Sequence, residues 1–161
     1  MTTETRKPIV AVHIRWMIRN DWPEVQAIEN SVFEFPWRED DFIRCLRIPA
    51  NIGMVAVANG QIAGYMIYEL HKHRLHILDF AVHEDCRYKG VGRQMVDKLK
   101  SKLSYDRRSR IMLEIRESNV DAQLFFRAMG FKCVSTLRSF YEDTPEDAYL
   151  MQYRFNTEPT P

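Results

Sequence analysis

The segment Arg87-Tyr88-Lys89-Gly90-Val91-Gly92 places two glycines among basic residues, where an apolar run gives way to a helical pattern. Such a turn can hold phosphate, because glycine lets the backbone come close and the amides of the following helix face the anion. A Walker A loop is excluded, since Arg93 and Gln94 stand where Lys and Ser or Thr are required. A dinucleotide fingerprint is excluded as well, since residue 95 is Met and the preceding strand belongs to an antiparallel meander. The segment predicts a different kind of anion site.

Histidines and cysteines form weaker patterns. His71, His73 and His76 lie within six residues. We expect no metal there, because no Cys or acidic partner stands at ligand spacing and the neighbouring Lys72 and Arg74 would repel a cation. The three cysteines are far apart and form no CxxC pair, which is typical of reduced thiols in a cytosolic protein.

The elements that must position these residues alternate between strand and helix. Residues 12–18 have a β-type pattern. Asp21 then offers an N-cap for a helix, with Pro23 in the first turn and Glu24 three residues on. A second short helix is expected over residues 39–47, before Pro49.

A β-hairpin is the clearest local signal. Two β-rich runs, residues 52–58 and 61–70, flank Asn59-Gly60, the pair that a type I′ turn favours. Residues 75–82 follow as a nearly continuous apolar run, which predicts a central strand covered on both faces.

The second half of the chain continues the alternation. One amphipathic helix is expected over residues 91–103. Ser118 to Asp121 predict a capping box for another, which ends at Met129 with Gly130 as C-cap. The remaining strands are expected over residues 110–116, 131–141 and 148–155.

Length and composition predict one globular domain over residues 9–156, with loose termini at 1–8 and 157–161. The chain has 161 residues, of which 45% are hydrophobic and 28% charged. A net charge of +1 argues against a nucleic-acid-binding protein. No stretch approaches the roughly 18 apolar residues of a membrane span, and no signal peptide is visible. We expect a cytoplasmic location; the oligomeric state stays open.

The form R-x-x-G-x-G at Arg87–Gly92, between a strand and an amphipathic helix, resembles the acetyl-CoA signature of the GCN5-related N-acetyltransferase (GNAT) superfamily. The resemblance covers about residues 12 to 155 and is greatest to the RimI-type enzymes that acetylate protein N-termini. It implies the GNAT fold, a mixed, mostly antiparallel sheet of about seven strands flanked by about four helices. The other segments that carry it are FPW at 35–37, LEIRESN at 113–119, FFRAMGF at 125–131 and RSFY at 138–141.

The resemblance implies acetyl-CoA as cosubstrate. Its pyrophosphate would bind the backbone amides of the glycine turn, and its pantetheine arm would pair with a strand. Lys89 and Arg93 would add charge or would simply be solvated. Asn119 would contact CoA, or it would stand in the first turn of its helix for local reasons only. The implied cofactor residues are Phe80, Ala81, Val82, Tyr88, Lys89, Gly90, Val91, Gly92, Arg93 and Asn119.

Glu114 matches the family's general base, which deprotonates the amine through water. By strand alternation it lies on the same face as Arg116, so a surface salt bridge to Arg116 or Arg110 is the alternative. His76 stands where related enzymes place a water-holding tyrosine, or it is a structural histidine. The tyrosine that usually protonates the leaving thiolate is replaced by Phe126. The thiolate then leaves unassisted, or water or Tyr141 supplies the proton, or the chain is not catalytic.

Phe35 and Tyr141 match positions on the two loops that flank the substrate N-terminus, whereas Trp37 is expected to pack in the core. The implied reaction is transfer of acetyl to the α-amino group of a protein N-terminus, with a ribosomal protein as one candidate. An α-amino group has a pKa of roughly 7.7 to 8.0, well below that of lysine, so its deprotonation asks less of the base. The alternatives are acetylation of lysine side chains or small amines, and a non-catalytic acyl-CoA-binding module.

Overall fold

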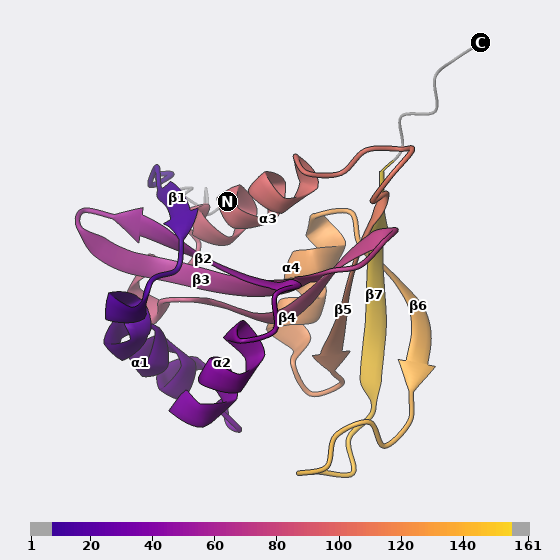
Figure 1. The fold of residues 1–161 in the computed structure, drawn as a ribbon. Helices are drawn as coiled ribbons and strands as arrows, with labels where there is room; N and C mark the ends of the chain where they lie inside the picture. The colour runs from indigo at the N-terminus through magenta and orange to yellow at the C-terminus, as the bar shows by residue number, and fades with distance from the viewer. Residues whose placement is uncertain (1–7, 156–161) are drawn as a thin grey trace, which may run out of the picture.

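The computed structural model describes residues 8–155, which contain four α-helices, two short 3-10 helices and seven β-strands (Figure 1). The predicted mixed α/β architecture is confirmed. The loose termini predicted at 1–8 and 157–161 lie, except for Pro8, outside the described residues. In chain order the elements are β1 (His13–Trp16), η1 (Arg19–Asp21), α1 (Trp22–Val32), α2 (Glu39–Leu46), β2 (Asn51–Ala58), β3 (Gln61–Leu70), β4 (Arg74–Val82), η2 (Glu84–Cys86), α3 (Val91–Lys100), β5 (Arg110–Arg116), α4 (Val120–Ala128), β6 (Lys132–Leu137) and β7 (Ala148–Arg154).

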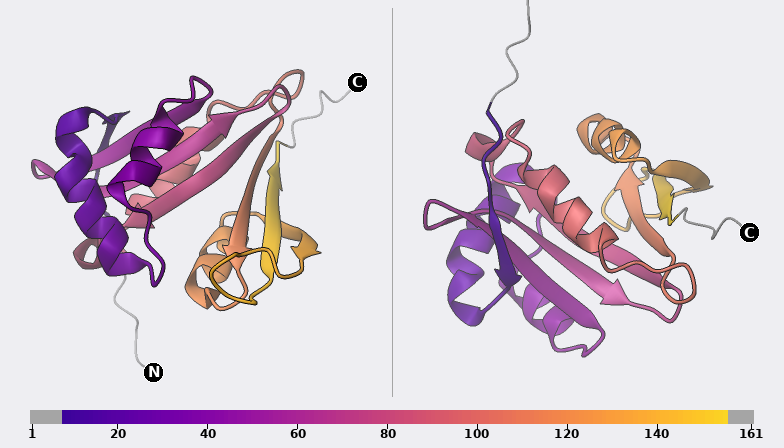
Figure 2. Two further views of the ribbon diagram at one scale, coloured as in Figure 1. Left: turned by 60° about the horizontal axis from the view of Figure 1, so that its bottom comes forward. Right: turned by 90° about the horizontal axis from the view of Figure 1, so that it is seen from above.

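The seven strands form one sheet in the order β1-β2-β3-β4-β5-β7-β6. Helices α1 and α2 cover one face and α3 and α4 the other (Figures 1 and 2). Two buried clusters follow from this layering. One lies between the sheet and the first helix pair, which contributes Val25, Ile28 and Phe42. The other lies between the sheet and the second pair, which contributes residues such as Met95 and Phe126.

The predicted hairpin is confirmed, with Asn59 and Gly60 both at positive φ (51° and 74°), as a type I′ turn requires. Helix α1 begins where predicted, with Asp21 at the N-cap and Pro23 in the first turn, but the Asp21 side chain makes no capping hydrogen bond. The Asp21 carboxylate binds Arg15 and the amide of Ile18 instead. Glu24 accepts a hydrogen bond from the amide of Ile62 in β3, at 2.9 Å, and so ties the helix to the sheet.

Three boundaries in the second half also differ from the prediction. Helix α3 ends at Lys100 and not at residue 103, and β6 ends at Leu137 and not at residue 141. The N-cap of α4 is Asn119, whose side-chain oxygen accepts from the amide of Ala122 at 3.1 Å. Ser118 instead donates its hydroxyl hydrogen to Glu146. The loop after β6 therefore holds the start of α4.

Strands β4 and β5 are parallel neighbours for only a short distance, and their separation creates the space for a site. Residues Arg74–His76 pair with Arg110–Met112, and beyond that point no described strand pairs with this edge of β4. A register shift opposite Ile67 and Tyr68 adds a bulge in β4 at Leu78. The backbone groups of the second half of β4 are consequently free on the side that faces β5.

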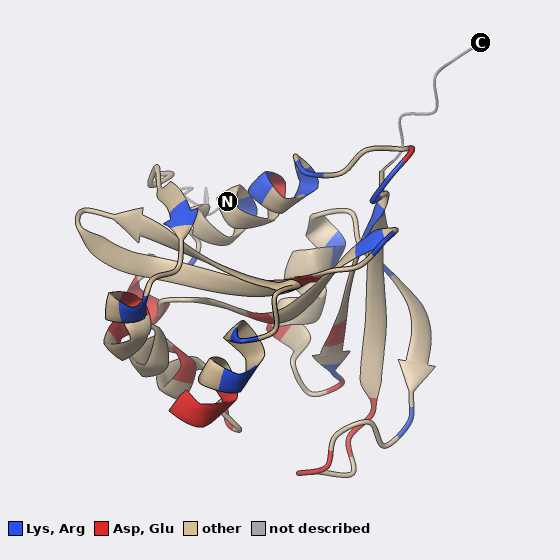
Figure 3. Cartoon of the chain, in the orientation of Figure 1, with Lys and Arg blue, Asp and Glu red and all other residues tan. Residues whose placement is uncertain are grey.

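Charge is unevenly distributed on this frame. The loop between β6 and β7 carries four acidic residues, and Figure 3 shows acidic residues at this loop and along α1 and α2. No helix within residues 8–155 is long and apolar enough to cross a membrane.

Candidate active site

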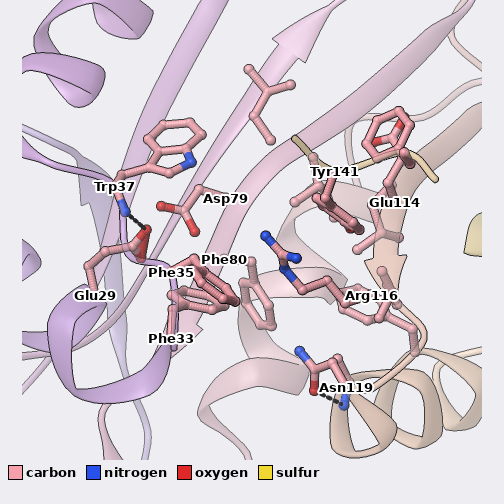
Figure 4. Close-up of a pocket in the computed structure, with 17 residues that line it drawn as sticks. Glu29, Phe33, Phe35, Trp37, Asp79, Phe80, Glu114, Arg116, Asn119 and Tyr141 are labelled. Atoms are coloured by element: carbon pink, nitrogen blue, oxygen red, sulfur yellow. Dashed lines mark hydrogen bonds between the residues drawn. The ribbon is translucent and has the colours of Figure 1, made fainter. Parts of the chain in front are cut away.

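Two adjoining cavities lie where β4 and β5 separate. The smaller, of about 250 Å³, is lined by the acids Glu29, Asp79 and Glu114 together with aromatic side chains (Figure 4). The larger, of about 610 Å³, extends from β4 to the glycine turn and α4. Phe80 and Phe126 line both, so the cavities meet at these rings.

An acid–base pair lies at the wall of the smaller cavity: Glu114 lines the cavity, and His76 stands behind it, outside the lining. Glu114 on β5 and His76 on β4 are joined by a hydrogen bond of 2.7 Å between Oε2 and Nε2. Both side chains are largely buried, with 22% and 15% of their area exposed. The sequence suggested each residue separately and left a salt bridge of Glu114 to Arg116 or Arg110 open. Arg116 pairs instead with Asp143 in the loop between β6 and β7.

Arg116 connects the two loops that were predicted to flank the substrate. Its guanidinium carbon lies 3.7 Å from the centre of the Tyr141 ring and 4.9 Å from that of Phe35. No pattern in the sequence singles out Arg116 for this role. Burial raises the pKa of Tyr141 to about 12, so its hydroxyl stays protonated well above neutral pH.

Phe126 supplies no proton donor to the cavities. Its side chain is 2% exposed and packs edge-on against Phe80, Phe125 and Phe131. Trp37 packs edge-on against Phe42, which confirms its predicted place under the first loop, and it also forms part of the cavity wall.

Glu29 and Asp79 are buried acids that the sequence analysis missed. Glu29 accepts hydrogen bonds from the Tyr65 hydroxyl and from the Trp37 amide, and Asp79 lies beside it. Burial raises the pKa of both carboxyl groups. Signals were present, because Glu29 follows Ile28 on the apolar side of its helix and Asp79 interrupts an apolar strand.

The glycine turn has the geometry of an anion cradle. Tyr88 and Gly90 adopt positive φ (63° and 78°), and Gly90 is the N-cap of α3. The amides of the first turn precede the first intrahelical hydrogen bond, which Gln94 donates to Gly90. Gly92 allows a close approach, because a Cβ there would lie 3.1 Å from the Phe125 ring.

The residues present fit a long, phosphate-bearing ligand such as acetyl-CoA. The free edge of β4 offers hydrogen-bonding groups to an extended chain, and the cradle lies at the other end of the larger cavity. All the predicted cofactor residues line this cavity except Lys89, namely Phe80, Ala81, Val82, Tyr88, Gly90, Val91, Gly92, Arg93 and Asn119. The side-chain oxygen of Asn119 is already used in capping α4.

The described residues contain no cluster of three His, Cys, Asp or Glu side chains that could hold a metal ion. His71 and His73 lie in the turn between β3 and β4, where His71 contacts Glu69. Because His71 and His73 lie outside the two strands, they do not point to the same face of the sheet.

Comparison with known proteins agrees with this geometry. Residues 20–131 match the model of the acetyltransferase (GNAT) family. An uncharacterized N-acetyltransferase of Methanocaldococcus jannaschii is 31% identical over 86% of this chain and 88% of its own. The N-alpha-acetyltransferase RimI of Mycobacterium tuberculosis is 30% identical over 94% of this chain and 96% of its own. The crystal structure of the ribosomal-protein-S18-alanine N-acetyltransferase from Escherichia coli superimposes with a TM-score of 0.80, at 25% identity, over 92% of this chain and 96% of that one.

Proposed function

Because this chain belongs to the GNAT family of acetyltransferases, which use acetyl-CoA, we propose that it acetylates the α-amino group of protein N-termini. The observation that carries the proposal is Glu114, which lines a cavity together with Phe35 and Tyr141 and is hydrogen-bonded to His76. The names of the Mycobacterium and Escherichia relatives support an N-terminal acceptor, and a ribosomal protein is one candidate. We further propose that residues 9–156 act as a single domain.

Binding of the cosubstrate is assigned to the backbone. The amides of residues 88–93 hold the pyrophosphate, and the free edge of β4 at Phe80, Ala81 and Val82 pairs with the pantetheine arm. Bound acetyl-CoA supplies an acetyl thioester and a thiol leaving group. The aromatic walls at Phe80 and Phe126 limit the access of bulk water between the two cavities.

The acceptor amine is activated by Glu114. A carboxylate accepts a proton from the amine through an intervening water, and the hydrogen bond from His76 orients that carboxylate. Tyr141 donates a proton to the departing thiolate, in place of the tyrosine that Phe126 replaces. Phe35 and Tyr141, held together by Arg116, contact the first residue of the acceptor.

A peptide panel tests this function. Peptides that differ in their first residue are incubated with acetyl-CoA, alongside Nα-blocked versions of the same peptides that carry one lysine. Mass spectrometry locates the acetyl group. We expect labelling of the free α-amino group and not of the lysine. Labelling that follows lysine alone would contradict the proposal in favour of a lysine or small-amine acceptor. Binding of acetyl-CoA without turnover on any amine would indicate a non-catalytic module.

A further inference from the structure

Glu29 and Asp79 form a carboxyl pair in the wall of the smaller cavity. They come from α1 and β4, and only 1% and 8% of their areas are exposed. Two carboxyl groups in contact cannot both ionise at low cost, so the pair holds one proton. Glu29 already accepts hydrogen bonds from Tyr65 and from the amide of Trp37, which favours its charged form. The proton therefore belongs to Asp79, which donates it to Glu29.

One oxygen of Asp79 has no partner. Its Oδ2 is buried and makes no hydrogen bond within the described part of the chain, although Asp79 lines the cavity. Figure 4 shows the Asp79 carboxyl beside Glu29 on one wall, with Glu114, Arg116 and Tyr141 across from it. A buried acceptor without a donor is costly, and a donor from a ligand would remove that cost.

The pair also carries one net negative charge that no neighbouring cation balances. Arg116, on the opposite wall, pairs with Asp143 and stacks on Tyr141. His76 is hydrogen-bonded to Glu114. These are the cationic or potentially cationic side chains among the described residues that line or adjoin the cavity. The charge of the pair is thus available to a positively charged ligand.

We propose that the Asp79 carboxyl turns toward the smaller cavity and accepts a hydrogen bond from the ammonium group of the incoming acceptor, and that the Glu29–Asp79 pair selects a charged primary amine. The inference rests on the proposed function, because it assigns the smaller cavity to the acceptor. The pair is a specificity-determining site and holds the ammonium before Glu114 takes its proton. An α-amino group is largely protonated at neutral pH, so a site that admits the ammonium form captures the abundant species.

The test compares binding of an acceptor peptide with binding of its analogue in which a hydroxyl replaces the α-ammonium. Dissociation constants are measured by calorimetry with CoA present, so that catalysis is not the readout. The unmodified protein is expected to prefer the ammonium peptide. Asp79→Asn resembles the protonated acid, since its amide can donate to Glu29 and its oxygen can face the cavity. The ratio of the two dissociation constants in Asp79→Asn should stay within about threefold of that in the unmodified protein.

Two other variants should lose the preference. Asp79→Leu removes the acceptor oxygen, and the double variant Glu29→Gln, Asp79→Asn removes the charge. Each is expected to lower the ratio of the two constants by about 10- to 100-fold, as for a hydrogen bond to a charged group. Asp106→Asn, in an exposed loop, is the matched control and should leave the ratio unchanged. Thermal melting checks that each variant is folded. If Asp79→Leu does not fold, the binding ratio of the double variant alone tests the proposal.

An unchanged ratio in the folded variants would overturn the proposal. Equal losses in Asp79→Asn and Asp79→Leu would also overturn it, because Asp79 would then act as a carboxylate. Failure of the proposed function is separate, since the peptide panel reports it. If the panel identifies another amine as the acceptor, the dissociation constants of that amine and of its alcohol analogue are compared in the same variants. An unchanged ratio of these constants would then contradict the role of the carboxyl pair.

Discussion

Glu114 Oε2 and His76 Nε2 lie 2.7 Å apart, although 38 residues separate them in the chain. The contact follows from the strand register. His76 pairs with Met112 at the last parallel step between β4 and β5, and Glu114 is two residues further along on the same face. The two side chains therefore face each other where the strands begin to separate, and they are positioned to act as a unit.

Glu114→Gln should lower kcat for the acceptor peptide by about 100-fold or more, because the general base is lost. His76→Gln should lower it less, and the double variant should be no slower than Glu114→Gln alone, as for residues that act together. Steady-state kinetics measure these effects, with the KM for acetyl-CoA as the internal control. Independent, multiplying effects of the two substitutions would contradict the paired role.

Tyr141→Phe should lower kcat by about 10- to 100-fold with a smaller effect on KM, because the ring remains while the proton donor is lost. A pKa of about 12 in the folded protein means that the donor form persists as the pH rises past the ordinary tyrosine value. The kcat of the unmodified protein should thus show no decline centred near pH 10. An unchanged kcat in Tyr141→Phe would contradict the donor role, and a decline near pH 10 that disappears in this variant would contradict the raised pKa.

Phe126→Tyr tests whether the missing tyrosine limits the enzyme. We expect turnover to change by less than about threefold, since Tyr141 is the proposed donor. We also expect a lower melting temperature, because a hydroxyl placed among aromatic rings lacks a partner. Turnover and thermal melting are measured together. A rise of several orders of magnitude from near zero would mean that Phe126 had inactivated the chain.

Gly90→Ala should weaken acetyl-CoA binding by about tenfold, because a positive φ of 78° is strained for alanine and the amides of the cradle would turn away. Gly60→Ala is the matched control. It introduces the same strain at φ 74°, in an open hairpin remote from the cavities. Both variants should melt at lower temperature, whereas calorimetry should show weaker binding only for Gly90→Ala. Equal affinity of both variants for acetyl-CoA would show that the glycine turn does not bind the cosubstrate.

The stability of the Asp79→Asn variant, relative to that of the unmodified protein, should increase as the pH rises. Burial raises the pKa of Asp79 in the folded protein, so the native state holds a proton that the unfolded chain releases above about pH 4. The unmodified protein therefore loses stability as the pH rises from that value through the folded pKa, whereas the asparagine variant has no such loss. The difference in melting temperature between variant and unmodified protein should grow as the pH rises above about 4. A constant difference would show that Asp79 ionises normally.

Much of the frame was predictable because its signals are local. Asn59 and Gly60 determine a hairpin through their own backbone preferences, and the glycine turn at Gly90 precedes a helix whose apolar stripe is visible in the sequence. Element ends were less predictable. Asp21 and Glu24 have the types of a capping box, but each finds a partner elsewhere in the fold.

The sequence by itself determined the order of the elements and the glycine cradle, because these depend on backbone preference and side-chain periodicity, whereas the candidate residues on each strand came from the resemblance to the GNAT family. Only the tertiary structure decided which of those residues meet. The short parallel pairing of β4 with β5 brings Glu114 to His76, and the packing of α1 on the sheet brings Glu29 to Asp79. Contacts of this kind depend on strand register and on burial between distant segments, neither of which any local pattern specifies.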